Sequence, residues 1–589
     1  MIGQSPKKRF QLVLIKPSHY DDDGYVIQWF RSIIPSNSMA ILHGLALDCI
    51  ERRVLGDDVE ITVSALDETN TRIRPERIAR SIARNGGGMV GLVGIQSNQF
   101  PRAMDIARRL RACGTQVCIG GFHVSGCLAM LPQLPPDIQE AMDLGISLFA
   151  GEAEGRLEEV LRDAHKGALK PLYNFMNDLP DLSAVPIPLL PSPRIKRTMG
   201  NVTSFDAGRG CPFQCSFCTI INVQGRKSRY RNADEIELIV RRNLAQGVNR
   251  FFITDDNFAR NKEWEAILDR LIRMREEEKL DIAFIIQADM QCHRTPNFID
   301  KAARAGVTRV YLGLESINPE SLLAAKKRQN KITEYRKMLL AWKRHRVTIY
   351  AGYIIGFPND TPEATIRDIE IIKRELPIDV LEFMFLTPLP GSEDHQRLYL
   401  AGRPMDPDMN KYDLEHVTTP HPRMSKSEWE RTYELAWKTY YSDEHVERVM
   451  RRVAATRMSL GKMMLLLAYF RGYSAIENIH PLQGGILRRK YRRDRRPIFP
   501  REAAGLFHLR YVAETIWKQA QIARLLWRHA KVRARLKRDP EARHYMDQAL
   551  TPVEDTELDT LEMFAASDAA KAAAAKARQA DEMRMRAIA

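Results

Sequence analysis

Short apolar runs that alternate with amphipathic segments constrain the fold of this 589-residue chain more than any other feature of its sequence. The runs have the length of strands, and in the segments between them apolar residues recur at helical spacing. Strands that alternate with helices favour a parallel sheet with helices on both of its faces. In the first part of the chain, the expected strands begin at Gln11, Val59, Met89, Gln116 and Ile146.

A second series of the same kind follows after residue 200, and each of its apolar runs precedes a helical segment with charged residues on one face. Six such units over about 200 residues favour a partial barrel, smaller than the closed form with eight units. Active sites in barrels of this type lie at the C-terminal ends of the strands. The expected strands begin at Val202, Arg250, Ile282, Arg309, Thr348 and Val380.

Composition divides the chain into four parts. The stretch DLPDLSAVPIPLLPSP between the two series is rich in proline, which disfavours helix and sheet interior and indicates a linker. After about residue 400 strand patterns fade, helical patterns dominate, and the chain ends in an alanine-rich tail. We therefore expect an α/β fold with a doubly wound domain over 1–168, a linker over 169–200, a partial (β/α)6 barrel over 201–400 and a mostly helical region over 401–589.

The net charge of +15 comes from the C-terminal region. Between Arg451 and Pro540 there are 22 Lys and Arg against 5 Asp and Glu, and the rest of the chain is close to neutral. In the segment IARLLWRHAKVRARLKR, apolar residues lie at near-helical spacing among Arg and Lys residues: Ile522, Leu525, Leu526 and Val532. This pattern suits an anionic membrane surface. There are two alternatives to membrane contact. The region could be a solvated basic face packed on the barrel, or it could bind nucleic acid, which is less favoured.

Nothing in the sequence indicates export or membrane insertion. The apolar run at Gln11 is broken by Lys16 and lacks a small-residue cleavage site. The longest uncharged apolar stretch near the C-terminus, Met463 to Phe470, is far shorter than the roughly 20 residues that span a bilayer. We expect a cytoplasmic protein whose only membrane contact is peripheral, at the inner face.

Three cysteines crowd into eight positions on the loop after the first barrel strand: Cys211, Cys215 and Cys218, a C-x3-C-x2-C spacing. Thiolates are the ligands of iron–sulfur clusters, and three of them leave one iron of a four-iron cubane open to another ligand. A structural zinc site has four protein ligands. No fourth cysteine follows closely, and the nearest downstream histidine, His293, is far along the chain. The remaining cysteines are scattered and have the character of small buried hydrophobes: Cys49, Cys113, Cys118, Cys127 and Cys292.

This spacing resembles the signature of the radical S-adenosylmethionine (SAM) superfamily, and Phe217 stands at the family's aromatic position before the third cysteine. The resemblance covers residues 201–400. It implies that SAM chelates the open iron through its amino and carboxylate groups. An electron from the cluster, provided by a donor such as flavodoxin or ferredoxin, then cleaves SAM to methionine and a 5′-deoxyadenosyl radical.

The resemblance also implies further SAM contacts, one motif at a time. Thr254-Asp255-Asp256-Asn257 stands where the family meets the methionyl amino group, although many relatives have Gly-Gly-Glu there. Glu315, at the end of the fourth strand, resembles the acceptor for the ribose hydroxyls. Ile354 and Gly356 stand in the fifth-strand pattern that lies near adenine.

The N-terminal part resembles the cobalamin-binding domain of cobalamin-dependent radical SAM enzymes, and the order of the parts matches that class. Glycines after two successive strands would let the backbone approach a bulky ligand closely. The D-x-H-x-x-G motif is absent, so the resemblance implies cobalt without a histidine ligand; a domain without its cofactor is the alternative. The expected cobalamin contacts are Pro17, Ser18, Ser97, Gly120, Gly121, Phe122, His123, Gly151 and Glu152.

The resemblance favours methyl transfer to an unactivated carbon of a small molecule, which would be lipid-like if the protein meets a membrane. Radical cyclisation or ring rearrangement uses the same architecture and stays open. A tRNA methylthiotransferase would need three more N-terminal cysteines, and a membrane- or nucleic-acid-binding module would use the basic region alone. Barrel residues that could line a substrate site are Gln287, Asp289, Tyr311, Tyr353 and Glu382.

Overall fold

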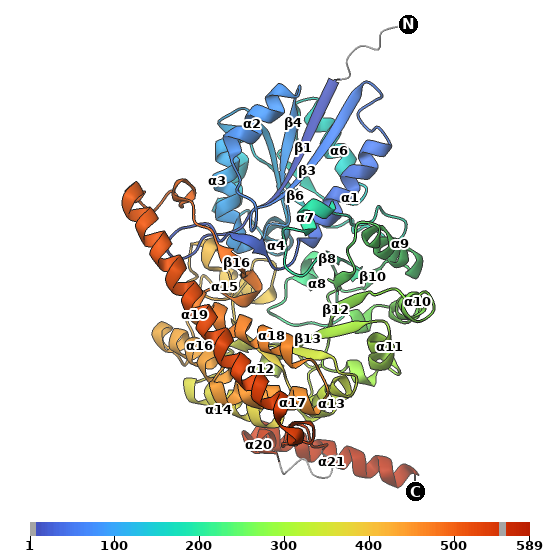
Figure 1. Ribbon diagram of the computed structural model, residues 1–589. Coiled ribbons are helices and arrows are strands. Elements are labelled where there is room, and N and C mark those ends of the chain that lie inside the picture. Colours follow the sequence, from blue (N-terminus) through green and yellow to red (C-terminus); the bar gives the residue numbers. More distant parts are fainter. Residues whose placement is uncertain (1–7, 553–560, 589) are drawn as a thin grey trace.

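A computed structural model describes residues 8–552 and 561–588 of the chain, so the first seven residues of the expected N-terminal domain lie outside the described residues. A parallel sheet with its helices forms one end of the molecule, and a second parallel sheet forms the middle (Figure 1). C-terminal helices lie along one side of both (Figure 1). None of the described helices is both long and apolar enough to cross a membrane.

The N-terminal sheet is six-stranded and parallel, in the order β3-β1-β4-β5-β6-β7. The five expected strands are all present. The sixth, β7, lies in the expected linker, before its proline-rich stretch, and pairs only with β6 at the edge of the sheet. The strands are β1 (Lys8–Lys16), β3 (Val59–Asp67), β4 (Gly88–Leu92), β5 (Gln116–Gly120), β6 (Ser147–Ala150) and β7 (Leu172–Asn174).

Helices cover both faces of this sheet, as a doubly wound fold requires. Successive residues of β1 point to opposite faces, so Leu12 and Leu14 join one apolar cluster while Val13 and Ile15 join another. The first cluster is closed by α1 (Asn37–Glu51) and α6 (Leu157–His165). The second is closed by α2 (Pro75–Arg84), α3 (Phe100–Arg111), α4 (Phe122–Met130) and α5 (Pro136–Asp143).

The second sheet is the expected partial barrel, six parallel strands in the order β15-β14-β13-β12-β11-β8. Its terminal strands β8 and β15 each pair on one side only, so the barrel is open between them. The strands are β8 (Val202–Phe205), β11 (Arg250–Ile253), β12 (Ala283–Ala288), β13 (Val307–Glu315), β14 (Thr348–Ile355) and β15 (Val380–Phe385). The outer helices include α9 (Ala233–Leu244), α10 (Trp264–Glu276), α11 (Phe298–Arg304), α13 (Tyr335–Arg344) and α14 (Pro362–Glu375).

The C-terminal region is mostly helical, as expected, and its first helix covers the exposed edge of β15. The hydroxyl groups of Tyr440 and Tyr441, on and just after α16, donate to the carbonyl oxygens of Ile378 and Leu381, each at 3.0 Å. A covered edge cannot pair with another chain. The helices are α16 (Lys426–Tyr440), α17 (Asp443–Ala455), α18 (Leu460–Gly472), α19 (Ala504–Arg538), α20 (Glu562–Ala565) and α21 (Asp568–Ile588).

One strand joins the two ends of the sequence. β16 (Gly485–Arg488) pairs in antiparallel fashion with β2 (Trp29–Ser32), and the indole of Trp29 donates to the carbonyl oxygen of Gln483 at 2.8 Å. The sequence pattern did not predict β16, because its pairing partner lies more than 400 residues away. The C-terminal region therefore contacts the N-terminal region as well as the barrel.

Candidate functional site

The three clustered cysteines lie on a tightly held loop between β9 (Gly208–Arg209) and α8 (Ile220–Val223). The backbone N–H of Cys211 donates to Gly225 at 3.2 Å, and that of Cys218 donates to Cys215 at 3.2 Å. Gly210, directly before the first cysteine, has φ +88°, and a Cβ there would lie 2.6 Å from the carbonyl oxygen of Lys227. The loop therefore depends on glycine at this position.

The thiols are partly or fully shielded from water and lie close enough to influence one another's ionisation. Burial raises the pKa of Cys211 to about 11 and that of Cys218 to about 12. Neighbouring donors favour negative charge on the sulfurs: the Gln329 amide lies 3.3 Å from the Cys215 sulfur, and Lys327 acts on Cys215 and Cys218. Three thiols beside such donors fit an iron–sulfur cluster. Among the described residues no group of three or more His, Cys, Asp or Glu, these three cysteines included, is arranged to hold a single metal ion.

The loop after β11 brings two carboxyl groups to this end of the barrel. Asp256 accepts a hydrogen bond from the Gly210 N–H at 3.0 Å, so it lies beside the cysteine loop. Burial raises its pKa to about 7 and that of Asp255 to about 6. Asp255 is fixed by the Asn261 amide at 2.8 Å, while Asn257 donates to Asp289 and keeps one buried amide oxygen without a partner.

Glu315 ends β13 in a left-handed backbone conformation, with φ +62°. Its carboxylate is ion-paired with Lys327, whose ammonium group also lies 5.7 Å from the centre of the Phe217 ring. On the adjacent strand, a Cβ at Gly352 would lie 2.4 Å from the Tyr311 hydroxyl oxygen and 3.7 Å from a Glu315 oxygen. Glycine at position 352 therefore lets the Tyr311 hydroxyl and the Glu315 carboxylate approach the backbone of β14 closely.

Of the residues expected near adenine, Gly356 has a clear packing role. Its φ is +113°, and a Cβ there would lie 1.9 Å from the Trp429 ring of α16. The Trp429 indole also donates to the Ile355 carbonyl oxygen at 3.1 Å. Ile354 packs nearby with Phe357, and Phe217 lies against the same small apolar cluster. Gly356 therefore allows α16 to seat against the end of β14.

Three of the five candidate lining residues share one face of the sheet, and the other two lie elsewhere. Gln287, Tyr311 and Glu382 alternate with core residues on the face of the sheet that lines the barrel interior. Tyr353 lies on the opposite face, where its hydroxyl contacts Asp368 at 3.3 Å. Asp289, expected beside them, is held by Arg260 at 2.6 Å, in the loop after its strand.

Glu382 is fully buried, and neither of its carboxyl oxygens has a hydrogen-bond partner among the described residues. Burial raises its pKa to about 8. Aromatic side chains from the barrel strands and from the C-terminal helices surround it. The tyrosines whose ionisation it influences are Tyr311, Tyr350, Tyr433, Tyr441 and Tyr469.

The expected cobalamin contacts gather at the carboxyl edge of the N-terminal sheet, close to α4. His123 is buried there, with one ring nitrogen 3.1 Å from the Ser97 hydroxyl and the other 2.8 Å from an Asp137 oxygen. Both nitrogens are thus engaged within the protein. Ser18, next to Pro17 at the end of β1, donates its hydroxyl to the Ile27 carbonyl at 2.6 Å.

Backbone groups dominate the rest of this edge. Gly121, between Gly120 and Phe122, has φ +149°, and a Cβ there would lie 2.1 Å from the Ile95 nitrogen. Gly151 follows β6, and its N–H donates to the Ser125 hydroxyl at 3.0 Å. Asn98, in the loop after β4, has a buried amide oxygen without a partner among the described residues. This donor set fits a cofactor held by backbone and amide contacts, and both ring nitrogens of His123 are engaged by Ser97 and Asp137.

Glu152, also expected to contact cobalamin, is turned towards the barrel. Its carboxylate accepts from Arg209 at 2.5 Å, and Arg209 also contacts Glu154 at 2.5 Å and Asp206 at 3.0 Å. All these side chains are buried. Because Arg209 directly precedes Gly210 and the first cysteine, this ion cluster joins the edge of the N-terminal sheet to the cysteine loop.

A second contact brings the same two regions together. Helix α4 packs against α8, which follows the cysteine loop, and both lie between the two sheets (Figure 1). A Cβ at Gly126 of α4 would lie 2.4 Å from the Pro390 carbonyl oxygen after β15. The carboxyl edges of the two sheets therefore face each other at close range.

The N-terminal cysteines do not form a second cluster site. Cys49, Cys118 and Cys127 are buried in apolar surroundings, where burial raises the pKa of each thiol, and Cys113 is exposed at the end of α3. The ligands that a methylthiotransferase would need in this domain are therefore not assembled.

Sequence reasoning missed Lys327, Arg209 and Trp429. None of the three stands in a recognisable motif, and the role of each comes from a partner on another element. A basic residue two positions before the cysteine motif was a signal for Arg209, but its three carboxylate partners are brought together only by folding.

Comparisons with known proteins agree with this geometry. Residues 206–372 match the radical SAM superfamily. The chain is 29% identical over 324 residues to bacteriochlorophyllide d C-12(1)-methyltransferase of Chlorobaculum tepidum, covering 53% of this chain and 66% of that protein. It is 28% identical over 362 residues to the C-8(2)-methyltransferase of the same organism, covering 58% and 75%. It is 24% identical over 327 residues to the hopanoid C-2 methylase of Rhodopseudomonas palustris, covering 54% and 59%.

Two solved structures share the fold over most of the chain. The radical SAM methyltransferase TsrM from Kitasatospora setae, with cobalamin and a [4Fe-4S] cluster bound, superposes with a TM-score of 0.54 at 15% identity, covering 75% of this chain and 90% of that one. The cobalamin-dependent enzyme OxsB with aqua-cobalamin bound gives a TM-score of 0.51 at 13% identity, covering 95% and 84%.

Residues 206–372, which include the cysteine loop, therefore form a radical SAM domain. The expected α/β architecture is confirmed, and the expected resemblance to cobalamin-dependent radical SAM enzymes is confirmed at the level of the fold. The TsrM structure contains cobalamin and a [4Fe-4S] cluster, and the OxsB structure contains cobalamin.

Proposed function

We propose that the protein is a cobalamin-dependent radical SAM methyltransferase that adds a methyl group to an unactivated carbon of a small molecule. The observation that carries this proposal is the close approach of the cysteine loop to the carboxyl edge of the N-terminal sheet, through Arg209 and the contact of α4 with α8. Two cofactors held at those two edges would meet over the open end of the barrel.

When bound, the cluster with SAM supplies a 5′-deoxyadenosyl radical and cobalamin supplies the methyl group. The chain's own residues bind these groups, orient them and keep water out. The proposed division of the chain is the one expected from sequence: a cobalamin-binding domain over 1–168, a linker over 169–200, the barrel over 201–400 and a helical region over 401–589.

At the cysteine loop, the proposed cluster ligands are Cys211, Cys215 and Cys218. Asp256 lies beside that loop and is suited to accept hydrogen bonds from an ammonium group, while Asp255 and Asn257 hold its loop in shape. The proposed SAM contacts are Phe217, Asp255, Asp256, Asn257, Glu315, Ile354 and Gly356.

Glu315 is suited to bind a pair of hydroxyl groups because Lys327 holds its carboxylate at the end of β13. Any residue larger than glycine at position 352 would collide with the Tyr311 hydroxyl, which lies beside the Glu315 carboxylate. Gly356 would act indirectly in this scheme, since its first role is to seat Trp429.

At the N-terminal sheet, the backbone at the glycines would lie against the corrin or its tail, and the engaged ring of His123 would shape the pocket rather than bind cobalt. Glu152 would act through Arg209, as a link between the two cofactor regions. The proposed contacts are Pro17, Ser18, Ser97, Gly120, Gly121, Phe122, His123, Gly151 and Glu152.

The substrate would enter the barrel interior lined by Gln287, Tyr311 and Glu382. A carboxyl group with a raised pKa keeps its proton near neutral pH, so Glu382 could both donate and accept a hydrogen bond. The tyrosine rings around it offer broad apolar faces. We infer a substrate with a large apolar or planar body and one hydrogen-bonding group.

Anaerobic reconstitution tests this function directly. We expect about four irons per chain, corrinoid bands in the absorption spectrum, and transfer of a deuterated methyl group from labelled SAM to product. A product that gains no label but loses hydrogen would identify the protein as a cyclase instead.

Cys215→Ala should abolish both the cluster absorption and 5′-deoxyadenosine formation. Cys113→Ala is the matched control, because Cys113 is exposed and far from the loop in sequence, and it should retain both. A Cys215→Ala protein that still cleaved SAM would contradict the proposal.

Two further expectations belong to this proposal. Reduction of the cluster would come from an electron donor of the flavodoxin or ferredoxin class, and the protein would work in the cytoplasm, at the inner face of the membrane. The contact with that membrane would involve residues outside the two cofactor regions.

A further inference from the structure

Helix α19 (Ala504–Arg538) packs one of its faces on the C-terminal helices. Leu525 is only 7% exposed and lies on the side that contacts α18, and Ile522, Leu526 and Val532 are at most half-exposed on the same stretch. These are the residues that the sequence suggested for a membrane face. Leu525 lies against Gly472 of α18 and Val532 packs on the barrel core, so this face helps attach the helix to the protein.

The outward side of α19 carries a second apolar stripe. Its six members are each between 53% and 74% exposed, and their spacing along the helix keeps them on one side over about 32 Å. Single exposed apolar residues are ordinary, but several large ones on one side of a helix mark a contact surface. We call this row the outer stripe: Leu506, Leu509, Val512, Ile516, Trp517 and Trp527.

Positive charge borders the outer stripe. Within 504–538 there are nine Lys and Arg and a single acidic residue, Glu514. Arg510, Arg524 and Arg528 are exposed, and the Lys531 ammonium lies 3.5 Å from the centre of the Trp527 ring. Arg510 is ion-paired with Glu502 and Arg528 with Asp443, so Arg524 and Lys531 contribute the charge least compensated by neighbours.

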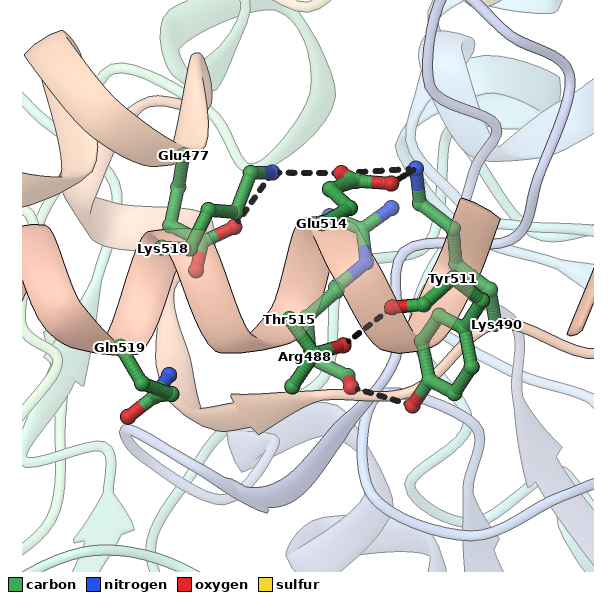
Figure 2. Close-up of a pocket in the computed structure, with 8 residues that line it drawn as sticks. All are labelled: Glu477, Arg488, Lys490, Tyr511, Glu514, Thr515, Lys518 and Gln519. Atoms are coloured by element: carbon green, nitrogen blue, oxygen red, sulfur yellow. Dashed lines mark hydrogen bonds and ion pairs between the residues drawn. The ribbon is translucent and has the colours of Figure 1, made fainter. Parts of the chain in front are cut away.

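The single acidic residue points away from the stripe into a group of ion pairs. Figure 2 shows Glu514 between Lys490, at 3.1 Å, and Lys518, at 2.8 Å, while Lys518 also contacts Glu477 at 3.0 Å. Its negative charge is therefore compensated on the inner side of the helix.

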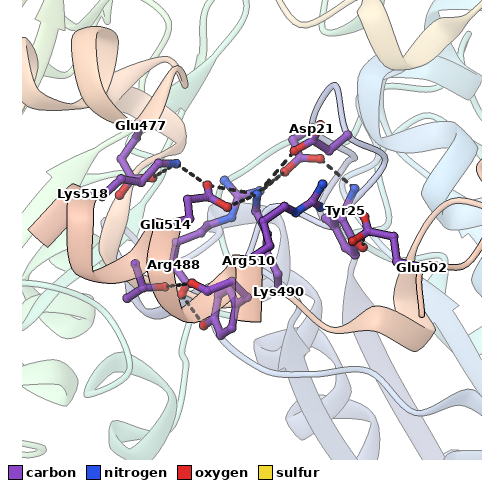
Figure 3. A network of polar contacts seen from close by, with 12 residues as sticks. Asp21, Tyr25, Glu477, Arg488, Lys490, Glu502, Arg510, Glu514 and Lys518 are labelled. Atoms are coloured by element: carbon purple, nitrogen blue, oxygen red, sulfur yellow. Dashed lines mark hydrogen bonds and ion pairs between the residues drawn. The ribbon is translucent and has the colours of Figure 1, made fainter. Parts of the chain in front are cut away.

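The same inner side attaches α19 to the N-terminal part of the chain. The Tyr511 hydroxyl donates to the Arg488 carbonyl at 2.9 Å, and Arg488 is ion-paired with Asp21 at 2.9 Å. Figure 3 shows this set of contacts extending to Tyr25 and Glu502, whose side chains are 2.8 Å apart. The helix is thus held in one rotation, with the outer stripe facing away from the protein.

We propose that the outer stripe docks the protein on an anionic lipid surface, with α19 lying in the plane of the interface. Apolar side chains would enter the boundary between headgroups and acyl chains, the two tryptophans would sit at headgroup level, and the bordering Arg and Lys would meet lipid phosphates. A second copy of the chain is disfavoured because two such faces would bring like charges together. A nucleic acid would use the charge but leave the apolar row exposed.

Flotation with lipid vesicles tests the proposal on the full-length protein. Vesicles of equal parts phosphatidylglycerol and phosphatidylcholine should carry the protein, and pure phosphatidylcholine vesicles should carry at least tenfold less. Tryptophan emission should shift to shorter wavelength on the anionic vesicles, and the shift should fall in Trp517→Phe and Trp527→Phe.

A pair of double variants separates this stripe from general surface hydrophobicity. Leu509→Ser with Ile516→Ser should lower the vesicle-bound fraction at least tenfold. Leu323→Ser with Leu400→Ser is the matched control, because these leucines are 61% and 62% exposed on the barrel side, and it should bind as the unaltered protein does. Circular dichroism and the melting temperature would verify that both variants are folded.

Three outcomes would overturn the proposal. The first is an unaltered protein that stays in solution with anionic vesicles. The second is equal vesicle binding by the two double variants. The third is a concentration-dependent dimer, or an RNA complex, that forms without lipid and is lost with Leu509→Ser and Ile516→Ser.

Discussion

A buried carboxyl group without a partner is costly for a fold, and Glu382 is such a group inside the barrel. The protein reduces this cost by keeping the group protonated, as its raised pKa indicates. Retaining a carboxyl there is consistent with the proposed contact to substrate.

Glu382→Gln should make stability less dependent on pH. Below about pH 4.5 the carboxyl is protonated in both the folded and the unfolded chain. Between about pH 4.5 and 8 only the unfolded chain releases the proton, so the folded protein loses stability as pH rises, by up to about 1.4 kcal/mol per pH unit. The variant lacks this loss. Denaturant unfolding at several pH values measures the difference.

The control for this titration is Glu434→Gln, since the Glu434 side chain is 67% exposed on α16. Its pH profile should follow that of the unaltered protein. Parallel profiles for Glu382→Gln and the unaltered protein would refute the assignment of a raised pKa to Glu382.

The cysteine loop depends on elements outside the barrel. Arg209 is ion-paired with Glu152, Glu154 and Asp206 in a buried cluster, and these carboxylates come from both sheets' edges. Arg229 and Arg231 contribute further positive charge beside Glu152 and Asp206. Breaking a buried ion pair by removing one partner leaves uncompensated buried charge, which costs far more than the pair itself contributes.

Arg209→Ala should therefore lower the free energy of unfolding by about 3–5 kcal/mol and reduce the iron content of the reconstituted protein. Arg241→Ala is the matched control, because Arg241 also contacts two carboxylates, Glu237 and Glu278, but is 43% exposed. It should cost about 0–1 kcal/mol. Similar losses in the two variants would contradict the buried-cluster interpretation.

The junction of α16 with the barrel rests on one glycine. Gly356→Ala would place a Cβ in the Trp429 ring and strain a backbone with φ +113°, so we expect a loss of about 3 kcal/mol or more. In chemical denaturation, Gly402→Ala should cost only about 1 kcal/mol, since its φ is +59° and its surroundings are open.

Truncating the ring should relieve part of the clash. The loss in Gly356→Ala with Trp429→Ala should then be smaller than the sum of the two single losses. Strict additivity would mean that the glycine and the indole do not share one site.

At the scale of the molecule, three contacts join its parts (Figure 1). Helix α4 packs on α8, β2 pairs with β16, and α19 runs beside both the N-terminal domain and the barrel. The first of these contacts closes the space between the two proposed cofactor regions. Its fit is tight, because Gly126 of α4 lies against the backbone of Pro390.

Gly126→Leu should separate the N-terminal sheet from the barrel, since the side chain would enter the Pro390 backbone. We expect a larger radius of gyration in solution scattering and two thermal transitions in place of one. Gly505→Leu is the control, as nothing lies within 4 Å of a Cβ there, and it should change neither measurement. An unchanged radius of gyration in Gly126→Leu would argue that this contact does not hold the N-terminal sheet to the barrel.

The sequence alone was sufficient for features encoded by near neighbours. The strands of both sheets follow from short apolar runs such as those at Val59 and Arg250, and the cluster loop follows from the spacing of Cys211, Cys215 and Cys218. These signals survive without tertiary context, because periodicity and ligand spacing are local properties.

Only the tertiary structure decided which faces and partners the residues take. It paired β16 with β2, placed Lys327 on Glu315, seated Trp429 over Gly356, and turned Leu525 inward and Ile516 outward on α19. Each of these depends on contacts between elements far apart in the chain. A helix with apolar residues on two faces can be buried on either, and the choice belongs to whatever packs against it.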